Sequence, residues 1–151
     1  LQAETLYRFC LAAKQLGKNQ ESIGLLEEAI ALVPSNAGIQ FELGNMYLGE
    51  KQLEKSVKHL EIANALQPKN PRILAALGYA WFNLRDPQRA SEFLEQSVQL
   101  APTFALAWFH LGNAQVELGD KSSAIESFKV AIQLQPTFNL AKDALSKVEG
   151  R

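Results

Sequence analysis

Apolar residues recur along this chain at the spacing of an α-helix, in pairs of runs that short polar segments separate. Leu74, Leu77 and Trp81 mark one such run. Leu94 and Val98 belong to the next run. Intervals of three or four residues place side chains on one face of a helix, so each run predicts an amphipathic helix. Two consecutive helices of this kind form a helical hairpin.

The hairpin pattern repeats every 34 residues, an interval marked by Pro34, Pro68, Pro102 and Pro136. This frame gives units at residues 3–36, 37–70, 71–104 and 105–138, with the proline at place 32 of each. Other places also repeat in kind: place 7 is apolar, places 8, 20 and 27 are mostly small, place 24 is leucine or phenylalanine, and place 30 is leucine. A fixed period of this length predicts stacked hairpins in a single domain over residues 1–151.

The fourth unit carries the clearest motif, formed by Trp108, Leu111, Gly112, Ala124, Phe128, Ala131 and Pro136. In this set the chain resembles the tetratricopeptide repeat (TPR) family. Gln115 replaces the family's usual aromatic residue at place 11, and Cys10 replaces the glycine in the first unit. The resemblance implies an all-α fold, a right-handed superhelical solenoid of antiparallel helix pairs.

Places 7, 8, 20, 24, 27, 30 and 32 are interpreted as the scaffold of each unit. Small residues at places 8, 20 and 27 have a steric reason, since packed helices approach within about 8 to 10 Å. Helix starts are also marked. Asp86 before Pro87 and Asn70 before Pro71 predict N-caps with proline at the first helical position, and Asp120 predicts a third N-cap.

Residues 139–151 begin as a fifth first helix, with an apolar stripe formed by Leu140, Ala141, Ala144, Leu145 and Val148. Lys142 and Glu149 are polar where a further helix would pack, which predicts a capping helix at the end of the array. Because the only methionine is Met46, we expect the chain to be a fragment of a longer protein, with upstream repeats left open.

Composition argues against several classes of function. The net charge is −1 with lysine and arginine scattered, so the sequence predicts no nucleic-acid interface and no membrane insertion. His59 and His110 lie in different units and Cys10 is the only cysteine, which predicts neither a metal site nor a disulfide. We therefore expect no cofactor, no catalytic residue and no enzyme activity. A single cysteine fits a reducing compartment and slightly favours the cytoplasm.

In the TPR family, places 2, 5, 9, 12 and 13 face a concave groove, and the resemblance carries that role to the matching residues here. The candidate peptide-binding residues are Tyr7, Leu11, Phe41, Asn45, Leu48, Arg72, Tyr79, Phe82, Asn83, Phe109, Asn113 and Val116. Their aromatic and apolar character suits an extended or helical segment with aromatic or aliphatic anchors. The alternative is that these aromatic side chains stack on one another between adjacent first helices.

One variant of the family grips the acidic tail of heat-shock chaperones with a lysine, two asparagines and two further basic residues. The matching places here hold Tyr7, Leu11, Glu42, Arg72 and Ala76. Only Arg72 has the required character, so we expect no binding of an acidic chaperone tail.

Three functions stay open. The favoured one is a protein-interaction scaffold or adaptor that binds a peptide or helix during complex assembly. The second is a substrate-recognition arm of a larger enzyme, such as the glycosyltransferases that resemble this architecture. The third is self-assembly, in which the N-terminal face or the groove accepts another copy.

Overall fold

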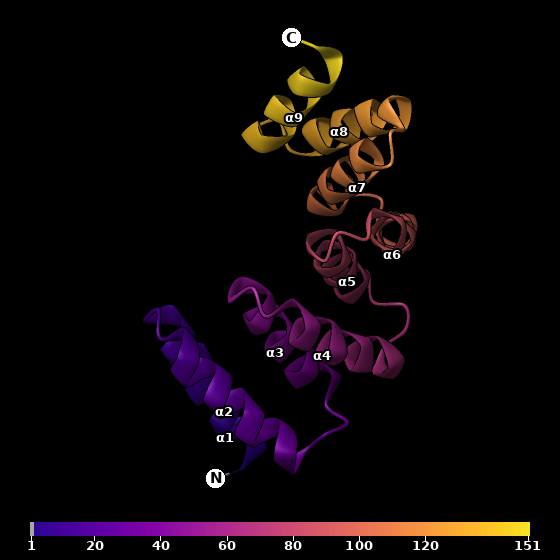
Figure 1. Cartoon of the computed structure of the whole chain (residues 1–151). Coiled ribbons are helices and arrows are strands. Elements are labelled where there is room, and N and C mark those ends of the chain that lie inside the picture. The colour runs from indigo at the N-terminus through magenta and orange to yellow at the C-terminus, as the bar shows by residue number, and fades with distance from the viewer. Residues whose placement is uncertain (1) are drawn as a thin grey trace. The chain divides into compact units, whose positions relative to one another are not determined.

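The computed structural model describes residues 2–151, and within that range every regular element is an α-helix (Figure 1). The helices are α1 (Ala3–Gln15), α2 (Asn19–Leu32), α3 (Ala37–Gly49), α4 (Leu53–Leu66), α5 (Pro71–Asn83), α6 (Pro87–Leu100), α7 (Ala105–Glu117), α8 (Lys121–Leu134) and α9 (Asn139–Glu149). The predicted all-α class and the two helices in each 34-residue repeat are confirmed.

Contacts divide the chain into two compact units, Leu1–Pro68 and Lys69–Arg151, which we call unit 1 and unit 2. In unit 1, α1 packs on α2, α3 packs on α4, and α3 also packs on α2. In unit 2, the hairpins α5–α6 and α7–α8 form in the same way, α7 packs on α6, and α9 packs on α8. The single domain predicted over residues 1–151 stays a prediction.

The glycines at place 8 have the steric role that the sequence predicted. A Cβ atom built on Gly112 would lie 2.5 Å from a ring carbon of Phe128. A Cβ atom on Gly78 would lie 2.4 Å from Cγ of Leu94. A Cβ atom on Gly44 would lie 2.6 Å from Cγ of Leu60. No side chain fits at these distances, so glycine sets how closely the two helices of a hairpin approach.

Cys10 takes the glycine's place in the first hairpin. Its side chain is buried in a core cluster with Leu6, Leu26 and Leu43. Burial raises the pKa of the Cys10 thiol, and the nearby Glu42 carboxylate raises this pKa further. The thiol therefore stays protonated at neutral pH and packs as a small apolar group.

The predicted helix starts are also confirmed. The Asp86 side chain accepts a hydrogen bond from the backbone N–H of Arg89 at 3.0 Å. Asn70 accepts one from the backbone N–H of Arg72 at 3.0 Å, and Asp120 accepts one from Ser123 at 3.1 Å. Each bond satisfies a donor that the first turn of a helix otherwise leaves open.

Three apolar assignments were wrong. The place 30 leucines, taken as scaffold, are exposed because each is the last residue of its second helix: Leu32, Leu66, Leu100 and Leu134. Phe9, at place 7, is 51% exposed because no described helix covers that side of α1. Leu140, assigned to the apolar stripe of α9, is 64% exposed, while Ala141 is fully buried in this helix.

Candidate peptide-binding faces

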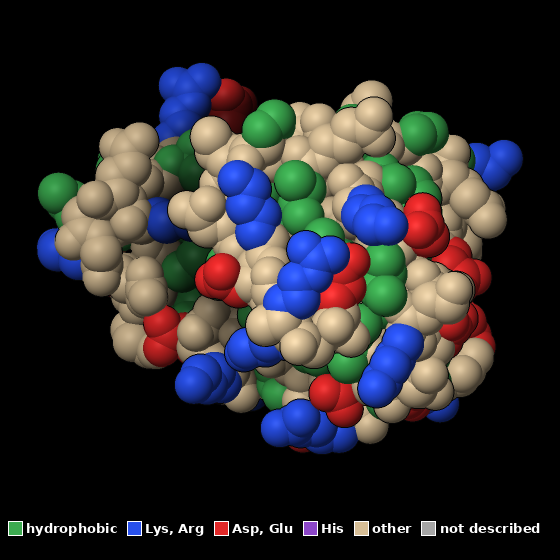
Figure 2. Space-filling view, turned by 90° about the horizontal axis from the view of Figure 1, so that it is seen from above, with side chains coloured by type: hydrophobic (Ala, Val, Ile, Leu, Met, Phe, Trp, Pro, Cys, Tyr) green, Lys and Arg blue, Asp and Glu red, His purple; other side chains and the backbone are tan. Residues whose placement is uncertain are grey.

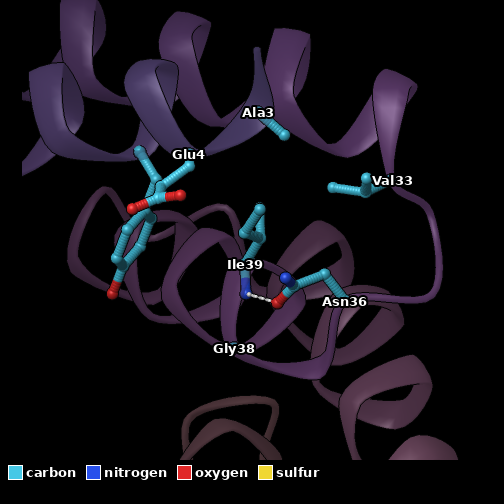
Figure 3. Close-up of a pocket in the computed structure, with 7 residues that line it drawn as sticks. Ala3, Glu4, Val33, Asn36, Gly38 and Ile39 are labelled. Carbon is cyan, nitrogen blue, oxygen red and sulfur yellow. Dashed lines mark hydrogen bonds between the residues drawn. The ribbon is translucent and has the colours of Figure 1, made fainter.

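Unit 1 contains a pocket of about 430 Å³ on the side of its first helices (Figure 3). Its walls come from α1, the segment after α2, and the start of α3. The lining residues are Ala3, Glu4, Tyr7, Val33, Asn36, Gly38 and Ile39. Tyr7 is a predicted peptide-binding residue, and Glu4 and Gly38 hold place 2 of the first two repeats, so three of the seven lining residues hold places that the sequence assigned to the groove.

Local structure explains why this pocket is open. Asn36 caps α3 by accepting a hydrogen bond from the backbone N–H of Ile39 at 3.0 Å, which fixes the floor. Gly38 has no side chain to fill the space between the two first helices. Ala3, Val33 and Ile39 approach the same space from different sides, and the Glu4 carboxylate lies at its edge (Figure 3). The lining is largely apolar with one acidic group.

The remaining candidates of unit 1 lie on α1 and α3. Leu11 is exposed, whereas Phe41, Asn45 and Leu48 are partly buried. Beside them, Lys14 Nζ of α1 lies 3.1 Å from a carboxylate oxygen of Glu42 on α3. This ion pair ties the two first helices together and offsets the positive charge of Lys14.

Unit 2 presents an aromatic cluster on its first helices. The Tyr79 ring of α5 stacks on the imidazole of His110 in α7, with ring centroids 4.4 Å apart. Phe109 lies beside His110 at 5.5 Å and contacts Phe138, just before α9, at 4.9 Å. Tyr79 remains 37% exposed. Stacking between adjacent first helices therefore occurs, and it leaves part of the cluster accessible.

The other candidates of unit 2 fall into two groups. Phe82 packs against the hydrophobic core, and the Asn83 side chain donates a hydrogen bond to the backbone oxygen of Tyr79 at 2.7 Å. Asn113 and Val116 are partly buried on α7, and Arg72 is exposed at the start of α5. The structure thus keeps most of the predicted residues accessible in part, although Phe82, like Tyr7 in unit 1, also packs against a hydrophobic core.

His110 is a residue of this cluster that sequence reasoning missed. It holds place 6, outside the places considered as groove-facing, although it precedes Asn113 by three residues and so shares its side of the helix. Desolvation lowers the pKa of His110 to about 4. The imidazole is therefore neutral at pH 7 and can stack on Tyr79 without a buried charge.

Residues 2–151 contain no group of three His, Cys, Asp or Glu side chains that could hold a metal ion. None of the helices α1–α9 is long and apolar enough to cross a membrane. On the face shown in Figure 2, lysine and arginine side chains alternate with acidic ones and form no continuous basic surface.

Comparison with protein families gives three matches, all described as tetratricopeptide repeat, at residues 13–79, 71–104 and 105–138. Together they span most of the chain. No curated protein sequence matches it closely enough to serve as a relative.

Several solved structures share the fold. MamA 41-end from Desulfovibrio magneticus RS-1 is 25% identical, with a TM-score of 0.83 over 91% of this chain and 78% of that chain. The first TPR of Spaghetti (RPAP3), bound to the HSP90 peptide SRMEEVD, is 21% identical, with a TM-score of 0.74 over 76% of this chain and 90% of that chain. YrrB, described as a TPR protein with an unusual peptide-binding site, is 19% identical, with a TM-score of 0.80 over 96% of this chain and 75% of that chain.

Proposed function

Because the chain belongs to the tetratricopeptide repeat family, we propose that it is a protein-interaction module whose first helices bind an apolar segment of a partner protein. The observation that carries the proposal is the pocket of about 430 Å³ beside Tyr7. Similar folds that are described as peptide-bound or as having a peptide-binding site support the class of ligand.

The size and lining of the pocket suit an anchor side chain. Ligand pockets in proteins typically measure about 300 to 1,000 Å³ and are mostly apolar with a few polar groups. Ala3, Val33 and Ile39 supply apolar walls, and Tyr7 supplies an aromatic one. Aromatic side chains that fill well-packed, desolvated pockets carry much of the binding energy at protein interfaces.

Unit 2 offers a second set of contacts to an apolar segment. Tyr79 presents part of its ring to solvent while its other face stacks on His110. Asn113, partly buried on the same helix as His110, presents an amide that can donate to a peptide carbonyl. Aromatic surface with a nearby amide fits a ligand whose side chains are apolar and whose backbone is polar.

An acidic tail is a poor ligand for these faces. The pocket of unit 1 carries the Glu4 carboxylate, and Lys14 is already paired with Glu42 at 3.1 Å. A peptide such as SRMEEVD, which the first TPR of Spaghetti (RPAP3) binds, would bring further negative charge to a site without a free cluster of lysines or arginines. We expect no measurable binding of that peptide to this chain.

The test is selection of peptides from a random 12-residue library displayed on phage, followed by NMR titration of the ¹⁵N-labelled protein. The proposal expects enriched sequences with aromatic or aliphatic anchors and chemical-shift changes at Tyr7, Gly38 and Ile39. SRMEEVD serves as the acidic comparison peptide. Shifts confined to the second helices α2, α4, α6 and α8 would contradict the proposed site.

A further inference from the structure

The pocket beside Tyr7 lies between two neighbouring first helices, and the N-cap residue of the later helix stands at its edge. In unit 1 this residue is Asn36, the N-cap of α3, at place 34 of its repeat. In unit 2 the same place holds Phe104, the N-cap of α7, and Phe138, the N-cap of α9. The three backbones agree, with φ between −86° and −77° and ψ between 80° and 103°. The difference at this place is therefore in the side chain.

In unit 2 a phenylalanine at place 34 packs at each junction of two first helices. The ring centroid of Phe138 lies 4.9 Å from that of Phe109, which holds place 5 of α7. Phe104 packs against the core cluster that contains Ala75, which holds place 5 of α5, and Ala107 of α7. Both phenylalanines are partly buried. The molecule thus places an aromatic ring against place 5, or against the cluster around it, at both junctions.

The equivalent junction of unit 1 has smaller and more polar residues. Tyr7 holds place 5 of α1, as Phe109 does on α7, but place 34 holds Asn36, whose side chain caps α3. Place 2 of the later helix is Gly38, where α9 has Leu140. A phenylalanine ring and a leucine side chain are therefore both missing from this junction, and a pocket of about 430 Å³ lies there (Figure 3).

We propose that the pocket beside Tyr7 binds an aromatic side chain of the partner protein, and that it selects phenylalanine over leucine or valine as the anchor. This inference rests on the proposed peptide site and names the side chain that the site selects. The argument is continuity with an arrangement already present in the molecule, since the partner's ring lies against Tyr7 as Phe138 lies against Phe109. Ring pairs with centroids about 4.5 to 7 Å apart attract each other beyond the area that they bury, which an aliphatic anchor does not reproduce.

Asn36 also provides a hydrogen-bond donor for the backbone of the bound segment. Its Oδ1 accepts the backbone N–H of Ile39 at 3.0 Å, which fixes the orientation of the amide. Figure 3 shows Nδ2 of Asn36 on the side where the Ile39 side chain enters the pocket. An amide nitrogen donates to a peptide carbonyl, so a segment whose ring enters the pocket can also bond to Asn36 through its main chain. The occupant is therefore a peptide segment with an aromatic anchor.

The test fills the pocket from within the chain. In Asn36→Phe the new ring should take the position that Phe138 takes in unit 2, whereas Asn36→Ala removes the cap and leaves the pocket open. The random 12-residue library on phage is selected in parallel on the unmodified protein and on both variants, after circular dichroism has shown that each is folded. On the unmodified protein and on Asn36→Ala, phenylalanine, tyrosine and tryptophan should be enriched at least about threefold more than leucine, isoleucine and valine. On Asn36→Phe this preference should disappear.

Three results would overturn the aromatic anchor while peptide binding itself stands. These are equal enrichment of aliphatic and aromatic residues on the unmodified protein, an aromatic preference that persists on Asn36→Phe, and a preference that both variants lose equally. If no sequence is enriched on the unmodified protein, the proposed function fails, and the aromatic anchor fails with it. The comparison on the unmodified protein needs no variant, so it decides between aromatic and aliphatic anchors even if Asn36→Phe does not fold.

Discussion

The first and fourth repeats, residues 3–36 and 105–138, have the same fold and fill it with different residues. In the fourth, Gly112 faces the large ring of Phe128, which is fully buried. In the first, Cys10 and Leu26 hold these two places and are also buried. A larger residue at place 8 accompanies a smaller one at place 24. The second and third repeats combine glycine with leucine at these places, so the two places lie against each other without a fixed combined volume.

The first and fourth repeats also differ at two further places. At place 6 the first repeat has Arg8, which is exposed and paired with Glu4, and the fourth has His110, which is stacked on Tyr79. At the start of the second helix, Lys18 makes no side-chain cap, whereas Asp120 accepts a hydrogen bond from Ser123. At these two places the fourth repeat uses its polar side chain for stacking or capping, and the first repeat leaves it exposed.

The largest expected difference between the repeats is the pH response of His110. Its pKa of about 4 in the folded protein lies below the ordinary 6.5, so the unfolded chain takes up this proton first as the pH falls. The resulting stabilisation is complete above pH 6.5, is lost between pH 6.5 and 4, and amounts to at most roughly 3 kcal/mol. Urea unfolding from pH 7 to 4 should show this loss.

The variant His110→Phe should flatten that pH dependence, because it keeps an aromatic ring and removes the titrating group. His59, whose pKa desolvation also lowers, provides the comparison. His59→Phe should leave the contribution of His110 in place. If the free energy of unfolding depends on pH equally in His110→Phe and in the unmodified protein, His110 is not a buried neutral imidazole.

Substitutions at place 8 and place 24 of the fourth repeat test whether these two residues are energetically coupled. Gly112→Cys should lower the free energy of unfolding by about 2 kcal/mol, since the new Cβ overlaps the Phe128 ring. Phe128→Leu alone should cost about 1 to 2 kcal/mol through the cavity that it leaves. The double variant should cost at least about 1 kcal/mol less than the sum of the two.

Gly24→Cys is the matched control for this exchange, because nothing lies within 4 Å of a Cβ at Gly24. It should change stability by less than Gly112→Cys does. If the effects of Gly112→Cys and Phe128→Leu on the free energy of unfolding are additive, the two places are independent and the predicted coupling between them is wrong.

Substitutions at the helix starts are expected to have the smallest effect on the free energy of unfolding. The backbone of Lys18 has φ −87° and ψ 67°, close to the −85° and 73° of Asp120, so it can already accept a capping residue. Lys18→Ser, three residues before Glu21, creates a capping box and should stabilise the protein by about 0.5 to 1 kcal/mol. Asp120→Ala should destabilise it by about 1 kcal/mol. Thermal unfolding measures both, and a lower melting temperature for Lys18→Ser would be the contrary result.

The sequence predicted the fold well because the repeat encodes packing redundantly. Gly44, Gly78 and Gly112 each report the same close helix approach, and Asn70, Asp86 and Asp120 each mark a helix start. Such features depend on residues that are only a few positions apart or that lie within one 34-residue repeat. Four copies of the pattern allow the common requirement to be separated from local variation.

The exposed and binding surfaces were harder to predict because they depend on which elements surround each copy. Phe9 and Leu111 hold the same place, yet only Leu111 has a preceding helix against it. His110 joins the aromatic cluster because Tyr79 in the preceding repeat lies 4.4 Å away, which place 6 alone does not reveal. The pocket at Tyr7 likewise arises from Gly38 and Val33 in other segments.

We propose that the first helices bind an apolar peptide at Tyr7, and one calorimetric comparison tests this binding most directly. A selected peptide is titrated into the unmodified protein, Tyr7→Ala, and Phe9→Ala, which removes an aromatic ring from the other side of the same helix. We expect at least a tenfold weaker affinity for Tyr7→Ala and an unchanged affinity for Phe9→Ala, with both variants folded by circular dichroism. Unchanged affinity for folded Tyr7→Ala would contradict it.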